Sequence, residues 1–150
     1  MTNQVFYPLL MVFCLLLVPA RAENIGKTAE SLEGTWELTS VVDSGSTAPT
    51  DAIRGAKVVF SKDVMTLISP DGEDKSEYTI KLEPKKSPKA IDIIPTVGTF
   101  KGQASLGIYE IDGDTLRLCQ PHRPSTSRPT KFSAPEGSEL HLMVLKRVKN

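Results

Sequence analysis

Cysteine is scarce in this chain, and its scarcity argues against a fold held together by disulfide bonds. The 150 residues contain two cysteines, and the first of them, Cys14, lies inside an apolar N-terminal run. If that run is removed as a signal peptide, Cys119 is left with no internal partner. We therefore expect Cys119 to be structural, a buried small apolar side chain, although a reactive thiol is the alternative.

An excess of charge of one sign is also missing. The chain has 18 basic and 18 acidic side chains, and removal of residues 1–22 takes away only Arg21. Nucleic acids and anionic membranes are bound through a positively charged surface, which a near-neutral chain of this length does not supply. We therefore exclude nucleic acid as a partner.

Catalytic and metal-binding motifs are absent as well. The sequence has no Gly-x-Ser-x-Gly elbow, no phosphate-binding glycine loop and no zinc pattern. Its two histidines, His122 and His141, are separated by a loop and lack metal-ligand spacing. His141 and Cys119 could form a thiol–imidazole pair only if their strands are neighbours and their side chains share a face. We expect no catalysis, no cofactor and no metal site.

The apolar run over residues 5–18 is about as long as the core of a signal peptide and too short to span a bilayer as a helix. A small-x-small cleavage pattern follows at Ala20-Arg21-Ala22. We predict a signal peptide over residues 1–22, a polar leader over 23–31 and one domain over 32–147. The mature chain would be exported to the periplasm or outside the cell as a monomer without a membrane span; a retained N-terminal anchor is the alternative.

What the domain does contain is a series of short alternating apolar runs separated by turn residues, which is typical of an all-β sandwich or barrel. The hairpin at Asp112-Gly113-Asp114 carries the strongest of these turn signals, with Gly113 suited to a positive φ. Eight strands are predicted, over residues 35–42, 57–61, 64–69, 75–82, 89–94, 105–111, 115–120 and 139–147, with a helical turn at 51–54 and a short edge segment at 130–132.

Eight sequential strands with short connections favour a mostly antiparallel up-and-down barrel, because closure removes exposed sheet edges. A two-sheet sandwich is the alternative. Alternation along the first strand places Trp36, Leu38 and Val42 on one face. In the fourth run, Tyr78, Ile80 and Leu82 share the inward face.

Several motifs support this architecture through a resemblance. Leu32-x-Gly34-Thr35-Trp36 resembles the opening motif of lipocalins and related calycin barrels. Together with Leu106-Gly107-Ile108-Tyr109-Glu110, Asp112-Gly113-Asp114-Thr115-Leu116 and Arg128-Pro129-Thr130-x-Phe132, it resembles a planctomycete-type lipocalin-like domain of unknown function. The resemblance implies a barrel in a secreted or envelope setting, and it brings no established ligand or reaction to carry over to this chain. Gly34 and Trp36 would then be structural, Trp36 closing one end under Lys146 or Arg147.

The chain departs from the better known barrel families. It has no Thr-Asp-Tyr segment of the second lipocalin motif. Its last strand also lacks the Arg-x-Tyr pair with which fatty-acid-binding proteins hold a carboxylate. A fatty acid is therefore not indicated as the ligand.

Candidate ligand-binding residues fall into two groups. Asp92, Tyr109 and Arg117 could converge on a ligand if the barrel interior is polar, or decorate its outside if the barrel is filled. His122 and Arg128 lie in a proline-bearing basic loop, Pro121 to Ser138, which we expect at the barrel rim together with Arg123 and Lys131.

Three classes of function follow: a carrier of a small molecule, an interaction module for an envelope protein, and an enzyme. A cavity of several hundred Å³ would favour the carrier, whereas a barrel filled by its own side chains would favour the interaction module.

Overall fold

The computed structural model describes residues 31–149. The predicted signal peptide and residues 23–30 of the predicted leader lie outside the described residues. The elements are, in chain order, β1 (Gly34–Asp43), β2 (Ser46–Thr47), α1 (Thr50–Ile53), β3 (Lys57–Ser61), β4 (Val64–Ile68), β5 (Lys75–Glu83), β6 (Lys89–Pro95), β7 (Ser105–Asp112), β8 (Thr115–Pro121) and β9 (Leu140–Arg147).

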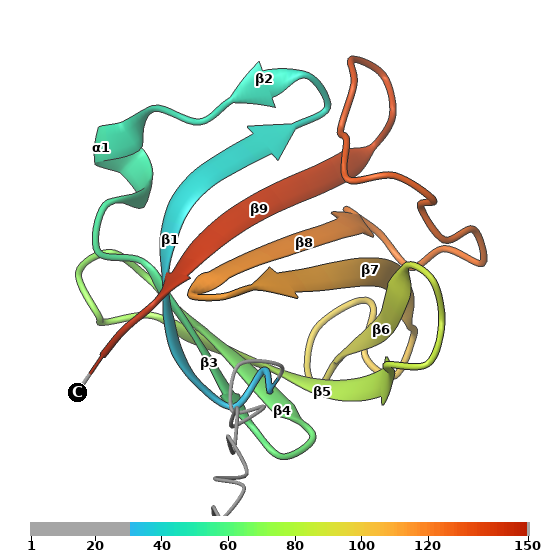
Figure 1. Ribbon diagram of the computed structural model, residues 1–150, viewed down its shortest axis with the longest axis horizontal. Helices are drawn as coiled ribbons and strands as arrows, with labels where there is room; N and C mark the ends of the chain where they lie inside the picture. The colour runs from blue at the N-terminus through green and yellow to red at the C-terminus, as the bar shows by residue number, and fades with distance from the viewer. Residues whose placement is uncertain (1–30, 150) are drawn as a thin grey trace, which may run out of the picture.

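The strands form a closed antiparallel barrel. Strands β1 and β3 to β9 each pair with their neighbours along the sheet, and β9 returns to pair with β1. The two-residue β2 pairs with β1 beyond the ring, and α1 lies on the same side of the barrel (Figure 1). The predicted all-β barrel is confirmed, and its strands begin and end within one residue of the predicted positions. Closure through β1 and β9 excludes the sandwich alternative.

Helix contributes little to this architecture. The helix α1 has four residues and none of them is buried. Among residues 31–149, no helix has both the length and the apolar character needed to cross a membrane.

One end of the barrel is closed by Trp36, whose side chain has no solvent exposure. Its indole N–H donates to the Leu32 carbonyl at 2.8 Å, which satisfies the one polar group of a buried tryptophan. The guanidinium carbon of Arg147 lies 4.0 Å from the centre of the indole ring system, a cation–π contact. Arg147 also donates to the carbonyls of Ser31 and Glu33, so it ties the start of the domain to the end of β9.

A β-bulge at Thr39 changes which residues of β1 face inward. Leu38 pairs with Leu145, but the next pair is Ser40 with Val144, so Thr39 is an extra residue in β1. An extra residue shifts the alternation by one. Val41 consequently packs against the core, and the predicted inward position of Val42 is wrong. By the same shift Asp43, the last residue of β1, is on the inward side and opposite His141.

The predicted inward row of β5 includes Leu82, which pairs with the buried Ile91, but Leu82 is 39% exposed because it lies near the end of β5, beside the turn into β6. A further prediction, the edge segment at 130–132, is wrong. Residues 130–132 make no strand; they bend, since the surrounding prolines cannot donate to a ladder.

The long connection between β8 and β9, residues 122–139 and hereafter the outer loop, runs outside the barrel (Figure 1). Its Ser133 carbonyl accepts from the Cys119 thiol at 3.6 Å, and its Ala134 is 4% exposed. Beneath it Ala90, Ile108 and Cys119 are neighbours in register and fully buried, although they alternate with the inward side chains. The outer loop therefore covers the outside of β6 to β8, and the predicted placement at the rim holds only for its first residues.

Candidate functional site

The barrel contains a cavity of about 320 Å³ at the end opposite Trp36. Leu116, Leu145 and Trp36, all fully buried, fill the closed end. At the other end the wall is mostly apolar, and its lining includes Leu38, Val41, Val58, Met65, Leu67, Tyr78, Ile93 and Met143. The interior is therefore hollow at one end of the barrel and packed at the other.

The open end of this cavity, hereafter the mouth, carries its polar groups. Gln103, Ser105, Gln120, His122 and His141 all line it, together with Phe100, which is 40% exposed. Ser105 donates to carbonyls within the outer loop and β8, so its hydroxyl is satisfied. The side-chain oxygen of Gln120 is different: it is buried and has no hydrogen-bond partner among the described residues. A buried acceptor without a donor costs about 1 to 3 kcal/mol.

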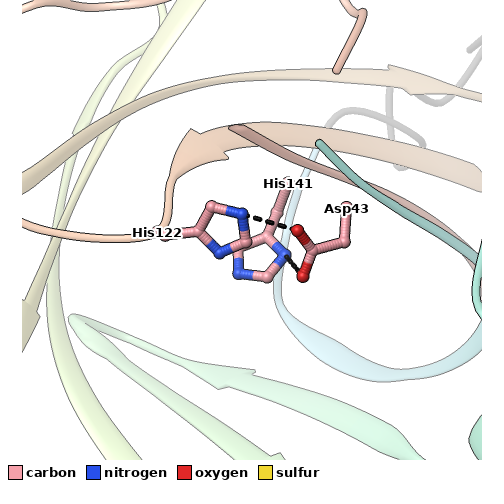
Figure 2. A group of neighbouring side chains, drawn as sticks. All are labelled: Asp43, His122 and His141. Atoms are coloured by element: carbon pink, nitrogen blue, oxygen red, sulfur yellow. Dashed lines mark ion pairs between the residues drawn. The ribbon is translucent and has the colours of Figure 1, made fainter. Parts of the chain in front are cut away.

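Three side chains at the mouth form a compact group, Asp43, His122 and His141, hereafter the mouth triad (Figure 2). One donor atom from each lies within 4.8 Å of the other two. Asp43 Oδ1 is 2.7 Å from His122 Nε2, and Asp43 Oδ2 is 3.6 Å from His141 Nδ1. The two imidazole rings pack against each other with their centroids 3.6 Å apart.

The backbone positions the mouth triad from three adjacent strands. Asp43 and His141 are register partners of β1 and β9, and His122 follows directly after β8. The His122 N–H donates to the Glu139 carbonyl at 3.0 Å, which extends the β8–β9 ladder by one bond. The Ser44 hydroxyl lies 3.3 Å from His122 Nε2 and adds a further polar contact. All three side chains therefore start from hydrogen-bonded backbone.

Burial lowers the pKa of His141, the neighbouring His122 lowers it further, and Asp43 acts in the opposite direction. The neutral form of this imidazole is thereby favoured. A neutral imidazole nitrogen is the form that accepts a hydrogen bond or binds a metal ion.

The structure does not bring Asp92, Tyr109 and Arg117 together. Tyr109 is 3% exposed and belongs to the inward core, but it is not part of the cavity wall. Arg117 lies outside, ion-paired with Glu110 and 5.1 Å from the centre of the Phe132 ring. Asp92 is also outside, since its neighbours Ile91 and Ile93 point inward. Of the two alternatives, convergence on a ligand is therefore not what the structure shows; Asp92 and Arg117 lie on the outside, and Tyr109 lies in the core.

Asp92 and Arg128 are instead joined to each other. Arg128 donates to Asp92 Oδ1 at 2.6 Å and to the carbonyls of Gly107 and Ile91 at 2.6 and 3.1 Å. Both side chains are largely buried, with 21% and 23% exposure for Arg128 and Asp92. This arrangement clamps the outer loop to β6 and β7. Of the predicted ligand-binding residues, His122 is the one that lines the cavity.

Cys119 and His141 do not form a thiol–imidazole pair. Their strands are neighbours, but Cys119 faces the outer loop whereas His141 lines the cavity. Burial raises the pKa of the Cys119 thiol, and the Ser133 carbonyl contact only partly opposes this. A thiol with a raised pKa is a poor nucleophile at neutral pH.

The mouth triad was not predicted from the sequence. His122 and His141 are close because the outer loop leaves β8 at the mouth and returns there at β9, so a long separation in sequence becomes a contact in space. Asp43 joins them only because of the bulge at Thr39. The signal that was available is positional: both histidines flank the same loop at its two ends.

Fold and cavity together define a closed eight-stranded antiparallel barrel with a small internal pocket that opens at one end. No protein-family model, curated protein or solved structure matches this chain.

Proposed function

We propose that this protein binds a small, mostly apolar molecule inside the barrel, and that the molecule carries at least one hydrogen-bond donor. The observation that carries the proposal is the mostly apolar cavity of about 320 Å³, whose lining includes Gln120 and other polar residues at the mouth. Ligand pockets are mostly apolar with a few placed polar groups, and they range from about 300 to 1,000 Å³. The cavity lies at the lower end of that range, which favours a small ligand.

In this proposal the protein binds its ligand without chemical turnover. The resemblance to lipocalin-like barrels and the predicted export support a carrier or sensor that works in the periplasm or outside the cell. The alternative, an envelope interaction module, requires a barrel filled by its own side chains, and a hollow interior does not favour it.

The proposal predicts that the folded protein binds N-phenyl-1-naphthylamine, an apolar dye with a single N–H donor, and that Val41→Phe weakens this binding by at least about tenfold, or 1.4 kcal/mol. Val41 lines the cavity, so the added ring occupies space that the dye needs. The measurement is a fluorescence titration, because the dye brightens on leaving water.

Val42→Phe is the matched control for this titration. Val42 adjoins Val41 but lies on the other side of the pleat and does not line the cavity. Its dye affinity should stay within a factor of about two, which corresponds to less than 0.5 kcal/mol. The proposal fails if the folded parent protein does not bind the dye, or if the two variants weaken binding equally.

A further inference from the structure

We propose that the mouth triad is a binding site for a divalent first-row transition metal ion, of which Zn²⁺ is the probe of choice. The site lies at the edge of the cavity, but binding of the ion does not require a ligand in the cavity. It therefore goes beyond the function proposed above and can be tested separately.

The donor atoms of the mouth triad suit a transition metal ion. Two imidazole nitrogens and one carboxylate oxygen, from His122, His141 and Asp43, lie within 4.8 Å of one another (Figure 2). Imidazole suits zinc, copper, iron and nickel, whereas calcium and magnesium are held by oxygen atoms alone. Open zinc sites have three protein donors, and water or another donor takes the remaining position.

The donor atoms of the mouth triad are also spaced close to the separation that a bound ion requires. Two ligands that bind a tetrahedral zinc ion through bonds of about 2.0 to 2.1 Å lie about 3.3 Å from each other. Asp43 Oδ1 lies 2.7 Å from His122 Nε2, and the other carboxylate oxygen, Oδ2, lies 3.6 Å from His141 Nδ1, so the two contacts lie on either side of that separation. Small side-chain rotations would therefore suffice, and the proton that now joins Asp43 to His122 would be replaced by the ion.

The mouth triad is accessible to solvent and is supported by the sheet. Asp43 is 49% exposed, while His122 and His141 are 25% and 30% exposed, so an ion can reach all three from solvent. The strands that carry them are joined by continuous ladders, from β1 to β9 and from β9 to β8. The Ser44 hydroxyl lies 3.3 Å from the same nitrogen, His122 Nε2, so a bound ion would replace this contact as well.

The arrangement also has an electrostatic reason to take up a cation. The rings of His122 and His141 are in contact, so two imidazolium charges would repel, and the single carboxylate of Asp43 would balance only one of them. A dication at the centre interacts favourably with the carboxylate and with both neutral imidazoles at once.

The test uses the full chain without a polyhistidine tag, freed of metal with a chelator and titrated with ZnCl₂ in a calorimeter. We expect one ion per chain. His122→Gln, His141→Gln and Asp43→Asn should each weaken binding by at least about 100-fold, since even the outer partners of metal ligands contribute 10- to 100-fold. Co²⁺ should give visible absorption bands in the parent protein that are lost in all three variants.

The matched control is Asp112→Asn, which removes an exposed carboxylate at the closed end of the barrel and should leave the zinc affinity within about twofold. Because a variant could lose binding by unfolding, each is compared by circular dichroism, and Zn²⁺ should raise the melting temperature of the parent and of Asp112→Asn alone. The proposal is overturned if the folded parent binds no Zn²⁺, or if its affinity survives replacement of both histidines. Repeating the dye titration in chelator separates this result from the proposed function.

Discussion

Trp36→Ala is expected to lower the free energy of unfolding by about 3 to 5 kcal/mol, the usual cost of removing a buried large aromatic side chain. Trp36 has no exposed surface, and its loss would leave the Leu32 carbonyl without its donor and Arg147 without the ring beneath it. Since a domain has a total stability of about 5 to 15 kcal/mol, this loss would bring the whole domain much closer to unfolding. The melting temperature should fall by roughly 10 to 20 °C.

Thermal unfolding followed by circular dichroism measures this effect, because the chain has one tryptophan and its fluorescence is lost with the substitution. Trp36→Phe is the control: it keeps a ring under Arg147 and loses the N–H donor and some volume, so it should cost distinctly less. If the free energy of unfolding of Trp36→Ala were less than about 1 kcal/mol below that of the parent, this residue would not close the barrel.

Arg128→Ala is expected to cost about 2 kcal/mol and to release the outer loop. The substitution removes an ion pair with Asp92 and two hydrogen bonds to backbone carbonyls, and it leaves Asp92 largely buried without its cation. Cys119 lies beneath this loop with no exposed surface. Its alkylation by iodoacetamide in the native protein should accelerate by about tenfold for each 1.4 kcal/mol by which the loop opens more easily.

Arg123→Ala is the matched control, since Arg123 is an exposed cation of the same loop and its removal should change stability by less than about 0.5 kcal/mol. A double-mutant cycle with Asp92→Ala separates the ion pair from the backbone contacts of Arg128. If Arg128→Ala and Arg123→Ala gave the same stability and the same alkylation rate, the contacts of Arg128 would not stabilise the fold or hold the outer loop in place.

Strand positions could be predicted from the sequence because the turns between them have local causes. Gly113, at φ 56° between β7 and β8, occupies a conformation that side-chain-bearing residues seldom adopt. The alternation of apolar and polar residues then predicted which side chains of each strand face the core. These signals act over a few residues, and that is why they could be read without knowledge of distant contacts.

The mouth triad depends on events that have no such local signal. The residues around Thr39 carry no sequence signal for a bulge, because the position of the extra residue depends on the register between β1 and β9. Without the bulge, the alternation that starts at Trp36 would turn Asp43 away from His141. The position of His122 requires the closure of the barrel as well.

The packing of the outer loop could not be predicted from local sequence either. Its prolines and cations correctly indicated an irregular segment, but composition does not say against what it packs. The burial of Ile108 and Cys119 on the outward side of their strands required a cover that alternation alone would not suggest. Asp92 and Arg128, 36 residues apart, become partners only once that cover is in place.

The hollow end of the barrel can be tested by methionine-methyl NMR of the labelled protein under xenon pressure. The chain has four methionines, and two of them, Met65 and Met143, line the cavity. Dry apolar cavities larger than about 150 Å³ take up xenon. We expect the methyl signals of Met65 and Met143, assigned by leucine substitution, to shift in a saturable way. If neither signal moved under xenon while the protein remained folded, the barrel would be filled and the cavity account would be wrong.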